Sequence, residues 1–388
     1  MLFRNWVGLA FVLFGLLLPY PIYSLSIENC ILFPLIEPFL LFLLELFWEF
    51  EPKIISGYSD GKILYLLFVI CFVFSAILLI INQFRFKTST EKIYTLCCQF
   101  LIYISAFFLF KYGFDKVIGT QFPIPEGNLL ETQLKNLDKD ILFWSAMSGS
   151  KLYIQFMGWI EIIPAFLILF ERTRKFGLIL SLGVLTNILF VNLGFNITVK
   201  LVSFYLLAVV LFLLSFYWKS IKPIIFSENQ FVKTELPSLI SNKKLRYTFT
   251  SLIVFVFLFE SIKPHLHQNE SSDNFKSYSF KENSLYTFLE VENVKNIHIH
   301  SDHFLILEKH TQNNEKQFES FPVQIRTQKF STEFFIPSIN KQFKIINQKK
   351  LQLSSENDTI ELKEINYSKS AFFNDNFYLF LEDFLDEE

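Results

Sequence analysis

Residues 63–84 have the sequence ILYLLFVICFVFSAILLIINQF, in which no Asp, Glu, Lys or Arg occurs. An α-helix needs about 20 predominantly apolar residues to cross the ~30 Å hydrocarbon core of a bilayer, and this segment is long enough. Helices that cover a water-soluble core normally keep polar residues on one face. The segment therefore predicts a transmembrane helix and, with it, an integral membrane protein.

Six further hydrophobic segments have the same character. They cover residues 6–25, 96–118, 152–170, 176–193, 197–218 and 247–262. The sequence therefore predicts an α-helical bundle of about seven transmembrane helices. Residues 38–50 are also apolar, but Glu45 and Glu49 interrupt them and Glu37 precedes them. We expect a helix there that lies at the membrane surface or packs on the bundle.

The composition excludes several classes of function. Of the 388 residues, 52% are hydrophobic and 19% are charged, and the net charge is −2. Nucleic-acid binding is not expected, because phosphate contacts need a basic surplus. Cys97 and Cys98 are adjacent, and the four cysteines form no Cys-x-x-Cys motif, so thiol redox chemistry has no support. The bilayer itself is the expected partner.

Basic residues predict the orientation in the membrane. They concentrate in alternate loops of a seven-helix topology: Arg85, Lys87 and Lys92; Arg172, Arg174 and Lys175; and Lys219, Lys222, Lys233, Lys243, Lys244 and Arg246. Cytoplasmic loops carry an excess of Lys and Arg. We therefore expect a bacterial inner-membrane protein with a cytoplasmic N-terminus and its C-terminus outside the cytoplasm.

The character of the chain changes near residue 265. The rest is polar and contains alternating strings such as Ile297-His298-Ile299-His300, which are typical of β-strands. We expect four parts: N-terminal helices with a surface segment (1–93), a four-helix membrane core (94–218), a cytoplasmic loop with the last helix (219–264), and a small β-rich extracytoplasmic domain (265–388). The last of these could bind a protein partner.

A resemblance to a known family rests on two short motifs. Residues 110–116, FKYGFDK, close one helix, and residues 158–161, GWIE, open the next; a basic turn at 171–175 and Lys200 follow. Residues 94–218 thereby resemble the DoxX family of small bacterial membrane proteins, and most closely its Bacteroidetes-type members. The resemblance implies a four-helix membrane core. Because the family includes a subunit associated with thiosulfate:quinone oxidoreduction, it also implies a link to quinone or redox physiology.

Ionisable side chains inside hydrophobic segments are candidates for function, because each costs at least ~2.5–3.5 kcal/mol to insert. Glu161 lies near the middle of its segment, where a functional role and a structural hydrogen bond are both open. The other candidates fall toward the outer side in this topology, where three lysines against two carboxylates would form a mildly positive pocket. The candidate pocket residues are Lys111, Tyr112, Asp115, Lys116, Glu161, Asn187, Asn192 and Lys200. Alternatively, Lys111 and Asp115 form an internal ion pair, and Lys116 and Lys200 extend to the headgroups.

The histidines restrict the cofactors. None of the six precedes His265, so the bundle offers neither a bis-histidine haem site nor a histidine-based metal centre. If the bundle carries out electron transfer, the cofactor is a diffusible quinone or belongs to a partner. In the C-terminal domain, His298, His300 and His303 are weak metal candidates, and solvent-facing strand positions are the preferred interpretation.

Three classes of function stay open: a membrane protein of quinone-linked physiology, a non-catalytic accessory protein with a partner-binding outer domain, and a binder or transporter of a small anionic or lipid-like molecule. No sequence feature identifies an enzyme or a substrate.

Overall fold

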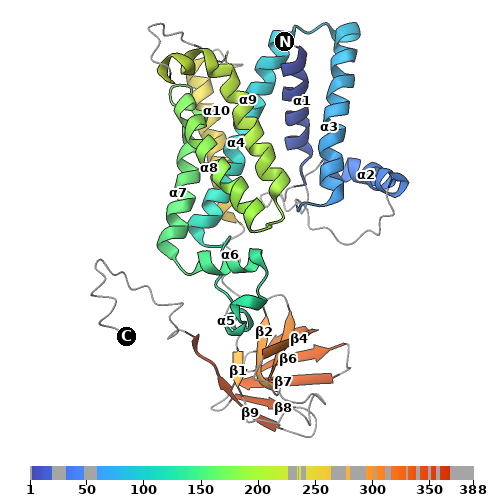
Figure 1. Ribbon diagram of the computed structural model, residues 1–388, viewed down its shortest axis with the longest axis vertical. Coiled ribbons are helices and arrows are strands. Elements are labelled where there is room, and N and C mark those ends of the chain that lie inside the picture. The colour runs from blue at the N-terminus through green and yellow to red at the C-terminus, as the bar shows by residue number, and fades with distance from the viewer. Residues whose placement is uncertain are drawn as a thin grey trace, which may run out of the picture. The chain divides into compact units, whose positions relative to one another are not determined.

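The computed structural model describes residues 2–19, 32–47, 59–225, 234, 236, 242–263, 277–279, 294–300, 303–310, 316–328, 331–337, 341–347, 351–354 and 359–367. Two compact units are present. One comprises Met1–Gln121 and Leu152–Leu266, and the other comprises Phe122–Lys151 and His267–Glu388. Figure 1 shows the helices of the first unit and the strands of the second.

The first unit is a helical bundle. Its helices are α1 (Leu2–Leu17), α2 (Phe33–Phe47), α3 (Lys62–Ile81), α4 (Thr90–Ile118), α7 (Lys151–Leu169), α8 (Arg174–Gly194), α9 (Lys200–Ile225) and α10 (Lys243–Ile262), and a π-helical turn, Asn82–Phe86, extends α3. Among the described residues, five helices are long and apolar enough to cross a membrane: Lys62–Phe86, α4, α7, α8 and Lys200–Pro223. Leu2–Leu17 and Thr250–Glu260 are shorter apolar helices. The membrane class is thus confirmed, and the count of seven stays a prediction.

Polar side chains mark where two of these helices begin. Ser89 accepts a hydrogen bond from the backbone N–H of Lys92 at the start of α4, and Asn242 accepts from Lys244 and Leu245 at the start of α10. Such N-caps satisfy N–H groups that have no partner inside the helix. Ser89 and Asn242 therefore determine where α4 and α10 begin, and the basic residues Lys92 and Lys244 lie in the first turns of these helices.

Aromatic rings and backbone hydrogen bonds pack the core of the bundle. The Trp6 indole donates to the carbonyl of Phe72 at 2.8 Å, and the rings of Phe14 and Phe68 meet edge to face at 5.0 Å. The Tyr205 hydroxyl donates to the carbonyl of Phe11 at 2.9 Å. Inside a bilayer, helices associate through close packing and hydrogen bonds rather than through release of water. These contacts therefore join α1 to α3 and α9.

The second unit contains a nine-stranded antiparallel sheet in the order β4-β3-β2-β1-β9-β8-β7-β6-β5. Only Val323 separates β4 from β5, so the first and last strands of this order are joined directly in the chain. The strands are β1 (Ser277–Ser279), β2 (Val294–His300), β3 (Phe304–His310), β4 (Lys316–Pro322), β5 (Gln324–Gln328), β6 (Ser331–Ile336), β7 (Lys341–Asn347), β8 (Leu351–Ser354) and β9 (Thr359–Glu364). The β-rich C-terminal part that was expected from the alternating sequence is confirmed, and its sheet is antiparallel.

The segment between α4 and α7 belongs to this second unit. Residues Phe122–Lys151, called the strap segment below, contain α5 (Gly127–Glu131), a 3₁₀ turn (Leu134–Asn136) and α6 (Lys139–Ser148). From the sequence, these residues were expected in the membrane core. The structure assigns them to the β-rich unit, because α5 packs against the sheet.

Strands β2 and β3 are consequently buried on both faces. Cross-strand partners share a face, so Ile297 and Leu307 lie on one side while Asn296 and Glu308 lie on the other. All four are buried. The preferred interpretation of His298 as solvent-facing is wrong: it is 1% exposed, because the strap segment covers its face of the sheet.

Candidate functional site

Two glycines bring α4 and α7 into close contact. A Cβ atom on Gly158 would lie 2.6 Å from the carbonyl oxygen of Gly113 and 3.0 Å from the backbone nitrogen of Val117, and one on Gly113 would lie 2.7 Å from the Ile162 side chain. Gly113 faces Ile162 while Val117, one turn later, faces Gly158, so the helices are antiparallel. Small residues permit such backbone contact between membrane helices.

Each glycine is followed three residues later by one member of a buried ion pair. Lys116 Nζ donates to Glu161 Oε2 at 3.0 Å and lies 2.9 Å from Oε1. Glu161 is 0% exposed and Lys116 is 6% exposed. The lysine turns back along α4, since its Nζ also lies 3.5 Å from the carbonyl oxygen of Tyr112. Glu161 Oε1 takes part in this ion pair but accepts no hydrogen bond.

A second pair lies one turn away on α4. Lys111 Nζ is 2.5 Å from Asp115 Oδ1, and their side chains are 7% and 17% exposed. Lys116 Nζ lies 5.9 Å from the centre of the Tyr112 ring, close enough for a cation–π contact. The structure therefore brings Lys111, Tyr112, Asp115, Lys116 and Glu161 together at one end of α4.

The remaining candidates lie elsewhere. Lys200 Nζ is 3.6 Å from Asp60, whose carboxylate also accepts the backbone N–H groups of Lys200 and Leu201 at 2.8 and 2.9 Å. Asp60 thus satisfies the first N–H groups of α9. Asn192 is buried in α8, whereas Asn187 is exposed on the outside of that helix. No contact found among the described residues joins Lys200, Asn187 or Asn192 to Glu161.

The charge count differs from the sequence expectation. Asp60 adds a third carboxylate, so each of the three lysines has an acidic partner within 4.0 Å. Glu260 is another buried acid, 3% exposed. It lies one turn beyond Phe257, which packs on Phe107 and Phe110 of α4. The expected excess of positive charge is therefore absent among these described residues.

Neither of these two acids is among the candidate residues predicted from the sequence. Glu260 carried a usable signal, since it is an ionisable residue inside an apolar run. Asp60 carried no such signal. It lies in a polar loop, and its role becomes visible only where the structure brings it to the first residues of α9.

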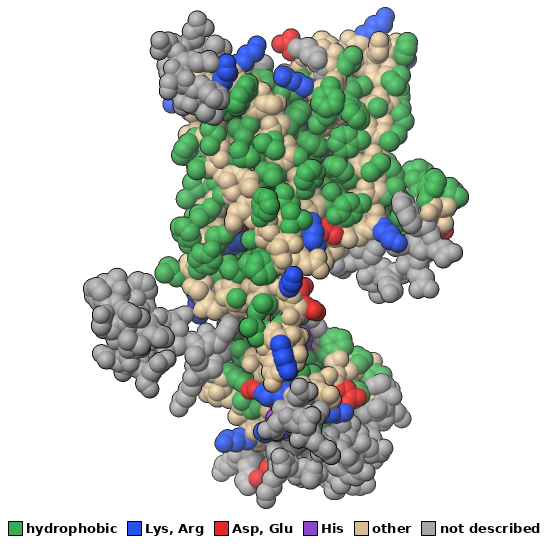
Figure 2. Space-filling view, viewed as in Figure 1, with side chains coloured by type: hydrophobic (Ala, Val, Ile, Leu, Met, Phe, Trp, Pro, Cys, Tyr) green, Lys and Arg blue, Asp and Glu red, His purple; other side chains and the backbone are tan. Residues whose placement is uncertain are grey.

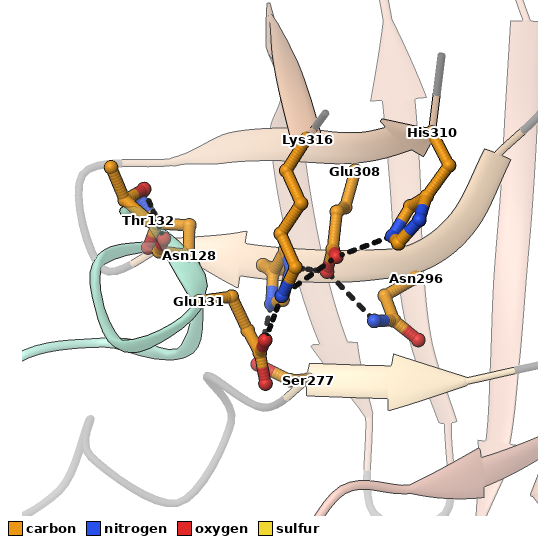
Figure 3. Close-up of polar contacts among 9 residues, drawn as sticks. Asn128, Glu131, Thr132, Ser277, Asn296, Glu308, His310 and Lys316 are labelled. Atoms are coloured by element: carbon orange, nitrogen blue, oxygen red, sulfur yellow. Dashed lines mark hydrogen bonds and ion pairs between the residues drawn. The ribbon is translucent and has the colours of Figure 1, made fainter. Parts of the chain in front are cut away.

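A second polar cluster occupies the covered face of the sheet (Figure 3). Glu308 lies at its centre and is 1% exposed. Asn296 Nδ2 donates to Glu308 Oε2 at 2.7 Å, His310 Nε2 lies 3.0 Å from Oε1, and Lys316 Nζ lies 3.3 Å from Oε1. Lys316 also pairs with Glu131 of the strap segment. The register explains the cluster, because β2–β3 and β3–β4 pairing puts these side chains on one face.

The environment shifts two pKa values in this cluster. Burial alone would raise the pKa of Glu308, but hydrogen bonds from His298, Asn296 and His310 and the charge of Lys316 hold it well below its usual range. Burial would lower the pKa of Lys316, but the hydrogen bond to Glu131 and the charge of Glu308 raise it overall. The cluster therefore holds its ion pairs in charged form at neutral pH.

Ser277, His298 and Glu308 form a chain that superficially resembles a catalytic triad. Ser277 Oγ lies 2.8 Å from His298 Nδ1, and His298 Nε2 lies 3.3 Å from Glu308. In hydrolases the serine meets Nε2 and the acid meets Nδ1, the reverse of this order. Gly127 also covers Ser277 so closely that even a Cβ would clash with Oγ. Gly127 thus covers the Ser277 hydroxyl, and the three residues form a structural network under α5.

The other histidine candidates do not converge. His300 Nε2 lies 3.8 Å from Glu126 of the strap segment, and His303 occupies the β2–β3 turn with a positive φ of 64°. In the described part of the chain, no three His, Cys, Asp or Glu residues are grouped closely enough to hold a metal ion.

Comparison with known proteins identifies one relationship. No family model and no solved structure matches the chain. The chain is 31% identical over 109 residues to the uncharacterized protein YwoB of Bacillus subtilis (strain 168), and the match covers 28% of this chain and 69% of YwoB. The chain belongs to the YwoB family. Because YwoB is itself uncharacterized, this kinship assigns no activity. Most of this chain lies outside the part that it shares with YwoB.

Proposed function

We propose that this protein is a non-catalytic accessory protein of the bacterial cell membrane. Its helical bundle anchors the β-rich unit outside the cytoplasm, where that unit binds a protein partner. The observation that carries the proposal is the position of the strap segment. Since it joins α4 to α7 and folds with the sheet, the second unit is connected to the bundle after α4, before α7 and after α10.

Three connections restrict a domain far more than one does. A domain on a single flexible linker samples many orientations. Three attachment points limit rotation, which suits a unit that must present one surface to a partner. The lysine–carboxylate pairs support the same conclusion, because their charges are mutually compensated in the bundle.

The proposed orientation follows from the distribution of charge. Figure 2 shows Lys and Arg side chains along the upper end of the bundle, where α4 and α10 begin. By the positive-inside rule this end is cytoplasmic. A reporter enzyme that is active only outside the cytoplasm, fused after Glu270, should then be active. Activity of a second reporter that works only in the cytoplasm, fused at the same position, would contradict the orientation.

Photo-crosslinking tests the partner. A photoreactive residue at Gln317 or Ser320, both exposed on β4, should give the same discrete protein adduct in native membranes. Excess unlabelled full-length protein in detergent should compete for that adduct. The lipid-facing Val69 and Val73 of α3, each 57% exposed, serve as controls and should give lipid adducts. Absence of a protein adduct at both Gln317 and Ser320 would overturn the proposal.

A second candidate is a small ligand at the outer end of α4 and α7. It is favoured by Glu161 Oε1, which is buried without a hydrogen bond. The motifs that resemble the DoxX family are those of this crossing, and the resemblance suggests a quinone. Titration of the purified protein with a short-chain quinone, followed by tryptophan fluorescence, tests it. Saturable quenching that Glu161→Gln abolishes would favour this candidate over the accessory role.

A further inference from the structure

Helix α2 packs on the bundle through one side only. It has 15 residues, fewer than the ~20 that span a bilayer, and it lies across the direction of α3 near the start of that helix (Figure 1). Leu40 and Leu44 are 0% exposed and belong to the same apolar cluster as Leu64 and Leu67 of α3. This side of α2 is therefore its bundle-facing side.

A second apolar side of α2 has no protein over it among the described residues. Leu35, Phe39, Phe42 and Leu46 are 78%, 52%, 58% and 63% exposed. Their spacing of four, three and four residues aligns them in one stripe, about 150° around the helix from Leu40 and Leu44 at 3.6 residues per turn. Figure 2 shows hydrophobic side chains over α2 at the right of the bundle.

An acidic residue of α2 lies between these two sides. Glu45 is exposed and falls between the stripe and the bundle-facing side, whereas Glu37 is half-buried and lies close to Leu44 around the helix. A helix with a bundle side, an exposed apolar side and an acidic side fits neither water nor hydrocarbon alone. It fits the boundary between them, where a helix lies in the membrane plane with its apolar face among acyl chains.

The depth of α2 agrees with this boundary. It lies beside the first turns of α3, and Asp60, directly before α3, pairs with Lys200 at the first turn of α9. Charged residues at helix ends mark the headgroup level. Helix α2 thus lies at the end of the bundle where the apolar surface of the helices ends and charged residues begin.

We propose that α2 is an in-plane membrane helix whose Leu35–Phe39–Phe42–Leu46 stripe contacts lipid acyl chains. Glu45 faces the headgroups and water. The proposal depends on the membrane location of the bundle and not on the partner-binding role, so either can fail alone.

Nitroxide labels on single cysteines test it in lipid vesicles. Phe39→Cys and Phe42→Cys probe the stripe, and Glu45→Cys is the matched control on the same helix. Cys30→Ser removes one native cysteine, while Cys71, Cys97 and Cys98 are buried. Oxygen concentrates in hydrocarbon and a nickel chelate stays in water. We expect the stripe labels to collide severalfold more with oxygen than with nickel, and the Glu45→Cys label to show the reverse.

Two outcomes would overturn the proposal. Nickel access at both stripe positions would place α2 in water. Labels shielded from both reagents, with spin–spin broadening that disappears on dilution with unlabelled protein, would place a second copy of the chain on the stripe. If the phenylalanine variants do not fold, Leu35→Cys replaces them, because it is the most exposed position of the stripe.

Discussion

Gly113 and Gly158 approach so closely that a Cβ on Gly158 would lie 2.6 Å from the carbonyl oxygen of Gly113. Three residues beyond each glycine, Lys116 and Glu161 form the buried ion pair between α4 and α7. The close approach and the pair therefore depend on one another, because a wider crossing would separate the carboxylate from the amine.

Gly158→Ala should destabilise the bundle by about 1–3 kcal/mol, the usual cost of overpacking a filled interior. The new methyl group would meet backbone atoms of α4, which cannot rotate away. Gly183→Ala is the matched control on α8, where nothing lies within 4 Å of an added Cβ. Unfolding in mixed micelles measures both variants, and equal stabilities would contradict the crossing.

Removing one member of the buried pair should cost more than removing both. Lys116→Met leaves the buried Glu161 uncompensated, which should cost about 3–5 kcal/mol. The double variant Lys116→Met/Glu161→Leu should recover a large part of this loss, since two apolar side chains fill the same space. Lys200→Met is the control, because the Lys200 side chain is 25% exposed in its own pair and should lose under ~1 kcal/mol. Additive losses in the double variant would disprove the coupling.

The C-terminal strands should not fold well without the strap segment. The sequence predicted a β-rich domain made of residues 265–388 alone, but the structure covers Ser277 and His298 with Gly127 of the strap segment. A fragment of residues 273–388 should therefore lack a cooperative thermal transition, and a fusion of residues 122–151 to residues 267–388 should show one.

Two variants of that fusion sharpen the test. Gly127→Val should abolish the cooperative transition of the fusion, because the valine side chain would clash with Ser277. Leu134→Ala should retain it, since Leu134 is 69% exposed. A cooperative transition of equal midpoint in the fragment without the strap segment would show that the sheet is autonomous.

The polar cluster should make the β-rich unit sensitive to acid. The pKa of Glu308 is lowered in the folded protein, so its contribution to stability is complete above its ordinary pKa near 4.5 and is lost as the pH falls below that value. The pKa of Lys316 is raised, so its contribution is complete below its ordinary value of 10.5 and is lost only as the pH rises beyond it. At pH 7 both contributions are intact.

Unfolding of the sheet, followed by its infrared amide band, should show a midpoint temperature that falls steeply from pH 5 to pH 3. Glu308→Gln should lower the midpoint at pH 7 and flatten this dependence. Glu319→Gln should change little, because Glu319 of β4 pairs with Lys309 of β3 and its side chain is 46% exposed. If Glu308→Gln left the pH dependence of the midpoint unchanged, Glu308 would not be the source of the acid sensitivity.

The sequence by itself determined the solvent and the secondary structure. Long uncharged runs such as residues 63–84 have to be helices in lipid, because every backbone N–H and C=O must find a partner within the segment. Period-two alternation around Ile297–His300 likewise predicted strands. Both are local properties, since a few consecutive residues contain the whole signal.

Tertiary structure decided which distant side chains meet. The sequence could place Lys116 and Lys200 on the same side of the membrane, but only the packing of α4 on α7 and the approach of Asp60 to α9 gave one lysine to Glu161 and the other to Asp60. It also moved residues 122–151 from the membrane core to the sheet, through Gly127 over Ser277 and Glu131 with Lys316. Hydrophobic patterning carries no information about such pairings, because a charged side chain is stabilised to a similar extent by any suitably placed partner of opposite charge. Helix crossing and strand register determine which partner is in reach.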